Sequence, residues 1–149
     1  MKGCPSCDGR LKSKRASYRL PDLPSIVLRD IAIYCCERCG EEMPAIPRLS
    51  RLMDTIVRSL IKKEDRLTGR ELRLIRGHLG LEGTDFAALL GVARETLSRW
   101  ENGHEPIGAS ADRLVRVVAA QVKGIKDFAI DSLANIGGKA RPLSLTISP

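Results

Sequence analysis

Two pairs of cysteines near the start of the chain have the spacing of metal ligands. Cys4 and Cys7 form one C-x2-C pair, and Cys36 and Cys39 form a second pair after 28 intervening residues. Each pair can fold into a tight turn that presents two thiolates to one ion, and four thiolates close a tetrahedral site. We predict one structural metal ion per chain bound by these four cysteines. Zinc is the expected metal, and mononuclear iron, which uses the same ligands, stays open.

Other chemistry is less well supported for these cysteines. A redox C-x-x-C pair usually lies beside a βαβ unit, and the sequence predicts none. Four cysteine ligands leave no open coordination position, and no general base is evident, so a thiol oxidoreductase or a zinc enzyme is only a remote alternative. The fifth cysteine, Cys35, alternates with Ile31 and Ile33, which favours packing as a small apolar side chain over metal ligation. We therefore predict no enzymatic activity.

The residues between the two pairs predict the hairpin that must hold them together. Residues 10–20 and 26–34 have strand-forming patterns, and residues 21–24, with two prolines, are typical of a turn. Gly9 and Gly40 follow the pairs, where a metal-binding turn often needs an unusual backbone angle. A module of about 45 residues buries too little apolar surface to fold alone, so we expect it to depend on the metal.

The rest of the chain has helical periodicity. Apolar residues recur at spacings of three and four from Leu49 to Ile61, and this stripe fits either packing within its own domain or a seam for a partner. Thr68 and Glu71 have the spacing of a capping box at the start of a helix. Between glycines that punctuate the sequence, we expect helices at residues 69–79, 84–90, 94–102 and 110–123, with a fifth at 125–135.

The most specific pattern lies in the middle of this helical region. It consists of Ala87-x2-Leu90-Gly91-Val92 followed by Leu97-Ser98-Arg99-Trp100-Glu101-Asn102-Gly103. Residues 67–123 closely resemble the Xre/Cro helix-turn-helix family, in which the helix after the turn enters the major groove of DNA. The resemblance implies that Arg94, Glu95 and Arg99 face bases, that Thr96 and Ser98 lie close to the backbone or bases, that Thr84 and Asn102 contact phosphates, and that Arg76 and Glu101 form a structural ion pair.

The sequence departs from the family pattern at three positions. Gly83 stands where a phosphate-binding glutamine is common, so we expect one anchoring contact to be missing. Ala93 stands where a serine or threonine usually caps the recognition helix, which should weaken its start. Glu95 is acidic on a surface that must approach phosphates; it either accepts a hydrogen bond from cytosine or complements the helix N-terminus and pairs with Arg99.

The whole arrangement resembles the MqsA-type antitoxins, whose N-terminal part is known as a YgiT-type zinc finger. The matching features are the first cysteine pair, the stretch YCCERCGEE at residues 34–42, the connecting helix and the C-terminal helix-turn-helix. The resemblance implies an autoregulatory repressor that binds an inverted-repeat operator in double-stranded DNA as a homodimer and contacts a toxin protein. A stand-alone regulator without a toxin partner is the alternative.

These features together predict an α+β fold with two independently folding units. We expect a zinc-binding β-hairpin module at residues 1–46, a connecting helix at 47–66, an all-α helix-turn-helix domain of four to five helices at 67–136, and a flexible tail at 137–149. Metal removal should then unfold the first module and leave residues 67–149 helical and able to bind DNA.

Composition agrees with an anionic partner but does not require one. The formal net charge is +7 and the pI is about 9.5, which suits nucleic acid or an acidic protein and equally serves solubility. Aromatic residues make up only 3% of the chain, which argues against a base-stacking RNA platform. No apolar run long enough for a bilayer and no signal peptide are present, so we expect a cytoplasmic protein whose thiols stay reduced.

Overall fold

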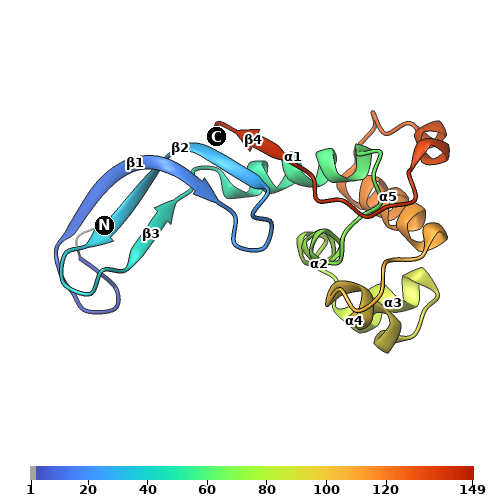
Figure 1. Ribbon diagram of the computed structural model, residues 1–149, viewed down its shortest axis with the longest axis horizontal. Coiled ribbons are helices and arrows are strands. Elements are labelled where there is room, and N and C mark those ends of the chain that lie inside the picture. The colour runs from blue at the N-terminus through green and yellow to red at the C-terminus, as the bar shows by residue number, and fades with distance from the viewer. Residues whose placement is uncertain (1–2) are drawn as a thin grey trace. The chain divides into compact units, whose positions relative to one another are not determined.

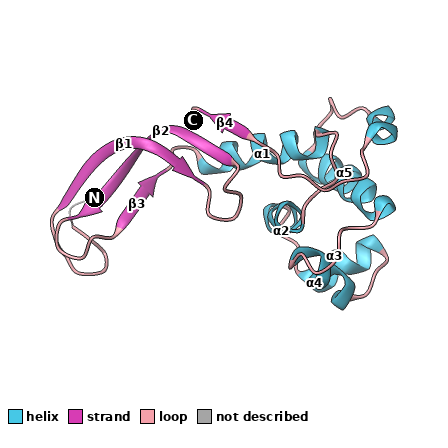
Figure 2. Cartoon of the chain, in the orientation of Figure 1, coloured by secondary structure: helices cyan, strands magenta, loops and turns pink. Residues whose placement is uncertain are grey.

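The computed structural model describes residues 3–149, which divide into two compact units (Figure 1). The first unit consists of residues 3–49 together with Ser144–Pro149, and the second is Ser50–Leu143. Strands occupy the first unit and helices the second (Figure 2). The predicted α+β class is therefore confirmed.

The first unit is a small sheet built on the predicted hairpin. Strands β1 (Leu11–Arg19), β2 (Ile26–Cys36) and β3 (Glu42–Ala45) pair antiparallel in that order, and β4 (Leu145–Ile147) pairs parallel with residues 26–28 of β2. The β1–β2 register shifts between Ala16 and Tyr18, and Asp30 opposite this shift has a φ of +56°. This irregularity lets Leu28 and Ile31, three residues apart, both be buried.

The second unit contains five α-helices and a 3-10 helix. They are α1 (Leu49–Lys62), α2 (Gly69–His78), α3 (Gly83–Leu90), α4 (Arg94–Glu101), α5 (Ala109–Lys123) and the 3-10 helix Ile130–Asn135. The capping box is present as predicted, since the Thr68 hydroxyl accepts from the Glu71 N–H and the Glu71 carboxylate accepts from the Thr68 N–H. Phe86, Leu97 and Trp100 are buried in the core.

Helix α1 is part of the helical unit and not a free connector. Its apolar stripe is buried within the chain; the stripe consists of Leu52, Ile56, Val57, Leu60 and Ile61. Of the two interpretations left open by the periodicity, packing within its own domain is the one that the structure supports. The compact helical unit consequently begins near residue 50, where the sequence had suggested residue 67.

A buried ion pair fixes the segment between α1 and α2. Arg116 of α5, 1% exposed, donates to Asp112 Oδ1 at 2.7 Å, to the Asp65 carbonyl at 2.7 Å, and also to the carbonyls of Ile61 and Lys63. Asp112 Oδ2 accepts from the Leu67 backbone N–H at 2.7 Å. These bonds satisfy four backbone groups that no helix pairs, and they tie the loop to α5.

The C-terminal segment, expected to be a flexible tail, is hydrogen-bonded to the rest of the chain at several points. Gly137 N–H donates to the Glu64 carbonyl at 2.7 Å, Arg66 N–H to the Lys139 carbonyl at 3.0 Å, and Leu143 N–H to the Glu71 carboxylate at 2.9 Å. The chain then returns to the sheet as β4. A three-residue strand and single loop bonds leave no periodicity in a sequence, which is why the pattern favoured a loose tail.

Candidate metal centre and nucleic-acid interface

The four predicted metal ligands come together in the sheet unit. The sulfurs of Cys4, Cys7, Cys36 and Cys39 all lie within 4.8 Å of one another. The Cys4–Cys39 and Cys7–Cys36 sulfur distances are 3.6 and 3.4 Å. Tetrahedral zinc with Zn–S bonds of about 2.3 Å requires sulfur separations of about 3.8 Å. The donor set therefore fits a tetrahedral metal ion.

Strand pairing explains how the two pairs meet. Leu11 at the start of β1 lies opposite Cys36 at the end of β2, so the loop that carries Cys4 and Cys7 lies against the turn that carries Cys39. Cys4 and Cys36 are buried, whereas Cys39 is exposed. A closed site with two buried ligands is typical of structural metal.

Backbone amides in the second turn favour the thiolate form of Cys36. The N–H groups of Cys39 and Arg38 donate to the Cys36 sulfur at 3.5 and 3.4 Å. The hydrogen bond from the Cys39 N–H has the largest effect. Together these bonds lower the pKa of Cys36 to about 6 despite its burial. For Cys7, a Gly9 N–H bond lowers the pKa, but the Cys36 sulfur and burial act in the other direction and the net pKa is raised. Clustered thiols cannot all ionise without a neighbouring cation, which a bound metal would supply.

The two glycines expected to have unusual backbone angles differ in their roles. Gly40 has a φ of +76°, as the turn requires. The positive φ in the first turn falls on Asp8, at +58°, and not on Gly9. Gly9 is required for space instead, because a Cβ there would lie 2.9 Å from the Cys36 sulfur and 2.7 Å from the Arg38 Cβ.

Cys35 lies outside the cluster of four sulfurs. It is half-buried, and its thiol points to Glu42 Oε1 at 3.5 Å. We expect Cys35→Ser to leave the metal content at one ion per chain, because the substitution removes no ligand. Elemental analysis of protein purified without chelator checks this, with Cys36→Ser as the neighbouring variant that should lose the metal. A lowered metal content in Cys35→Ser would contradict the ligand assignment.

The helix-turn-helix is formed by α3, a three-residue turn and α4. Gly91 closes α3 with a φ of +69°, and Ala93 caps α4 without a side-chain hydrogen bond, in line with its expected weakness as a cap. Leu97 and Trp100 bury one face of α4. The opposite face forms an open concave surface lined by Arg94, Glu95, Ser98 and Arg99.

The residues implied by the resemblance differ in how far they are exposed. Arg94, Glu95, Arg99 and Thr84 are exposed, and Thr96 and Ser98 are half-buried. Glu95 and Arg99 form no ion pair among residues 3–149, so the Glu95 carboxylate stays available to a ligand.

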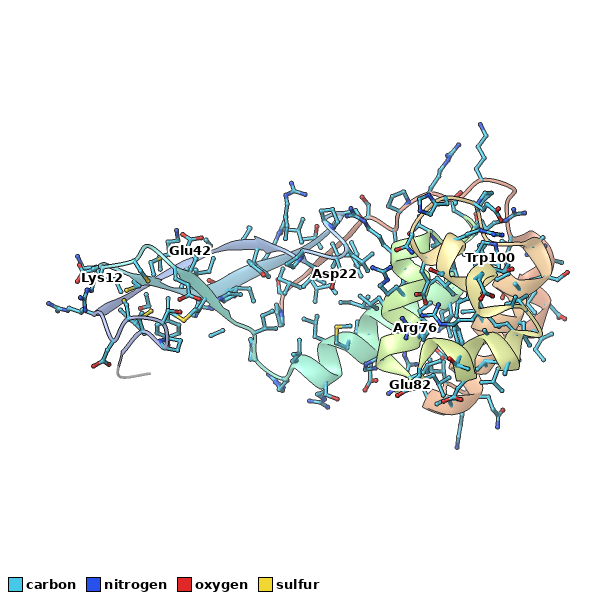
Figure 3. The ribbon with its side chains drawn as sticks, turned by 90° about the horizontal axis from the view of Figure 1, so that it is seen from below. Lys12, Asp22, Glu42, Arg76, Glu82 and Trp100 are labelled. Carbon is cyan, nitrogen blue, oxygen red and sulfur yellow. The ribbon has the colours of Figure 1, made fainter. Side chains whose placement is uncertain are left out.

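An ion pair holds α4 against α2. Arg76 Nε and Nη2 donate to the two oxygens of Glu101 at 2.6 and 3.1 Å, and Nη1 donates to the Leu81 carbonyl at 3.1 Å. Figure 3 labels Arg76 among the side chains of the helical unit. Glu101 is 6% exposed. The pair therefore fixes α2, α4 and the loop before α3 together, which is a structural role.

Asn102 is hydrogen-bonded to Arg73, a residue that was not among those predicted for this site. Its Oδ1 accepts from Arg73 Nη2 at 2.6 Å, and its Nδ2 donates to the Ser98 hydroxyl at 3.2 Å. Arg73 lies three residues before Arg76 and so on the same side of α2. That spacing is the signal from which Arg73 could have been found.

The basic strand β1 is not a free cationic face. Lys12 pairs with Glu37, Lys14 with Glu42 at 2.6 Å, and Arg15 with Asp30 at 2.5 Å. Each of these positive charges has an acidic neighbour on the same sheet.

Comparison with known proteins gives a match for one part of the chain. No curated protein and no solved structure matches it. Within residues 3–149, no helix has both the length and the apolar character needed to cross a membrane. Residues 68–122 match the family model described as a helix-turn-helix domain. These residues comprise α2 to α5 almost completely, so the match covers the helices that form the helix-turn-helix described above.

Proposed function

We propose that this protein is a sequence-specific DNA-binding regulator, a repressor, with a structural zinc ion and no enzymatic activity. The observation that carries the proposal is the exposed face of α4, where Arg94, Glu95, Ser98 and Arg99 share one open surface of a helix-turn-helix domain. In such domains this helix enters the major groove of double-stranded DNA. The net charge of +7 favours approach to the phosphate backbone.

Arg99 is the side chain best suited to read a base. It is exposed on this face, and among residues 3–149 it forms no ion pair. A free guanidinium can donate two hydrogen bonds to O6 and N7 of guanine. The unpaired Glu95 carboxylate nearby can accept from cytosine N4.

Arg99→Ala should weaken operator binding by about 1–3 kcal/mol and relax preference at one base pair. The measurement is fluorescence anisotropy on a duplex selected by the full chain from a random pool, and on its single-base variants. Arg113→Ala, on α5, is the matched control and should bind as the unsubstituted protein does. Wild-type affinity and specificity in Arg99→Ala would show that α4 is not the recognition helix.

Zinc in the four-cysteine site is supported by donor chemistry. Four thiolates at tetrahedral separations suit zinc, and the closed ligand set leaves no position for a substrate. Cys4, Cys7, Cys36 and Cys39 would hold the ion, which supplies structural stability and not a reaction. This is the reason for proposing a regulator over a zinc enzyme or a thiol oxidoreductase.

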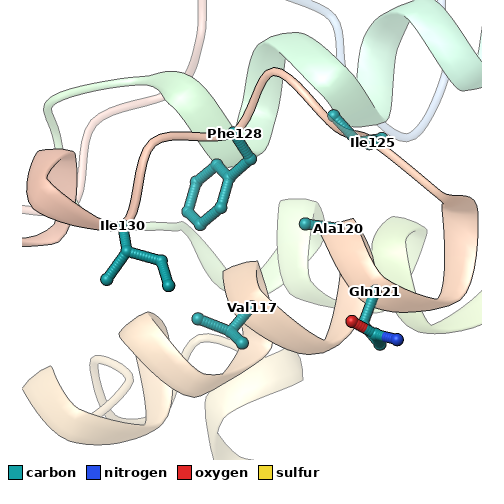
Figure 4. Close-up of a pocket in the computed structure, with 6 residues that line it drawn as sticks. All are labelled: Val117, Ala120, Gln121, Ile125, Phe128 and Ile130. Atoms are coloured by element: carbon teal, nitrogen blue, oxygen red, sulfur yellow. The ribbon is translucent and has the colours of Figure 1, made fainter.

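A homodimer on an inverted repeat fits the single recognition helix of each chain. Two-fold dimers of this kind bind half-sites about 34 Å apart, or a multiple of that distance. Apolar side chains remain exposed near the end of the domain: Leu114, Val122 and Ile130. Ile130 also borders an open pocket with Phe128 and Val117 (Figure 4). These residues support self-association through this end of the unit.

The finer proposal is an autoregulatory antitoxin, in which the sheet unit contacts a toxin protein. Its support is the resemblance of the cysteine pairs and their order before the helix-turn-helix to MqsA-type antitoxins. A stand-alone regulator has the same site residues. Isolation of the protein with its partners, together with the reading frame beside its gene, separates the two: a co-purifying toxin supports the first, and none supports the second.

A further inference from the structure

Gly83 provides space that another residue of the site occupies. It is the first residue of α3 and is buried. A Cβ at this position would lie 2.5 Å from both Cζ and Nε of Arg94, and 2.7 Å from its Nη2. The guanidinium therefore lies directly against the Gly83 backbone. Any larger residue at position 83 would displace it.

Arg94 lies at the N-terminal end of the open face of α4, close to the first turn of α3. Arg94 is the first residue of α4, and its side chain reaches back to the first turn of α3. Arg94 is exposed, and among residues 3–149 it forms no ion pair. Two features thus come together at the start of α3: the guanidinium of Arg94 lies against Gly83, and the next residue, Thr84, is exposed.

We propose that Arg94 binds a DNA backbone phosphate at the start of α3 and does not read a base. We further propose that Gly83, which has no side chain, leaves the space that positions the Arg94 guanidinium there. The proposal rests on the DNA-binding function above and refines the role of one residue in it. The missing glutamine at position 83 is then replaced by an arginine from the next helix. A guanidinium binds phosphate through paired, charge-assisted hydrogen bonds.

Phosphate and base contacts differ in how binding responds to salt and sequence. Loss of one phosphate contact weakens binding to all duplexes by a similar factor and reduces the slope of log K against log salt by about 0.9. Loss of a base contact changes the preference at one base pair. We expect Arg94→Ala to weaken binding to a selected duplex and to an unrelated duplex alike, on the order of tenfold, with the reduced salt slope.

The substitution Gly83→Ala tests whether the space at Gly83 positions Arg94. The three atoms nearest to its methyl group all belong to the flexible end of Arg94, so the fold should be retained and thermal stability unchanged or higher, since alanine favours helix over glycine. DNA binding should nevertheless fall as in Arg94→Ala, and the double variant should be no weaker than Arg94→Ala alone. Gly77→Ala on α2 is the matched control, because a Cβ there meets nothing within 4 Å.

The experiment uses the full zinc-loaded chain, a 30-base-pair duplex selected from a random pool, and an unrelated duplex of equal length. A changed base preference in Arg94→Ala, or wild-type binding by Gly83→Ala, would overturn the inference and leave the proposed function standing. If the losses of DNA binding in Gly83→Ala and Arg94→Ala add up in the double variant, Gly83 does not act by positioning Arg94. No binding of any duplex by the unsubstituted chain would overturn the proposed function, and the inference with it.

Discussion

Removal of the metal is expected to unfold the sheet unit while the helical unit stays folded. The sheet unit buries few large side chains, and metal binding contributes on the order of 10–16 kcal/mol in small four-ligand zinc modules. All four ligands lie in residues 3–49, and the helical unit contains none of them. Amide hydrogen exchange with and without a chelator, under reducing conditions, measures this directly. Protection should be lost in β1 and β2 and retained in α2 to α5.

Two variants control for side effects of the chelator. Cys36→Ser should reproduce the loss of protection in β1 and β2, because it removes a buried ligand, and Cys35→Ser should not. Full protection of β2 in the metal-free protein would show that the sheet unit folds on its own core. Parallel loss of protection in α2 to α5 would show that the two units fold as one.

The same reasoning changes which fragment should retain DNA binding. The sequence favoured a unit at residues 67–149, but that fragment lacks the buried stripe of α1 and the three carbonyl groups that Arg116 binds. We therefore expect residues 50–143 to stay helical and bind DNA, and residues 67–149 to be destabilised. Circular dichroism and anisotropy on both fragments distinguish the two boundaries.

Arg116→Met is expected to destabilise the helical unit by about 3–5 kcal/mol. The substitution leaves the Asp112 carboxylate, fully buried, without its charged partner, and loss of one member of a buried pair costs about this much. It also frees the carbonyls of Ile61, Lys63 and Asp65. Urea unfolding, followed by the fluorescence of the single tryptophan, Trp100, provides the measurement.

A control and a double variant separate charge from backbone pairing. Arg113→Ala removes a bond to the Ala109 carbonyl one turn earlier on α5 and should cost less than about 0.5 kcal/mol. The double variant Asp112→Leu with Arg116→Met has no unpaired charge but leaves the carbonyls and the Leu67 N–H unsatisfied. It should therefore stay strongly destabilised. Recovery to wild-type stability would show that only the charge imbalance matters.

Local patterns in the sequence were sufficient for the features that rest on short-range chemistry. The spacing of Cys4, Cys7, Cys36 and Cys39 predicts a four-sulfur site because each pair needs only a tight turn. The capping box at Thr68 and the glycine at position 91 mark where helices begin and end, since those residues act on their own backbone. Helical periodicity likewise placed α2 to α5 and the face of α4 that is free to bind.

Features that depend on contacts between distant residues were decided only by the tertiary structure. Arg116 looks like one more charged residue on α5 until the α1–α2 loop folds over it, and β4 has no pattern until β2 offers an unpaired edge. Gly83 reads as a lost phosphate contact until the turn brings Arg94 against it. A sequence gives the chemical groups of each side chain. Which of these groups come into contact depends on chain segments that approach one another only on folding. Burial and pairing then set the energy of those contacts.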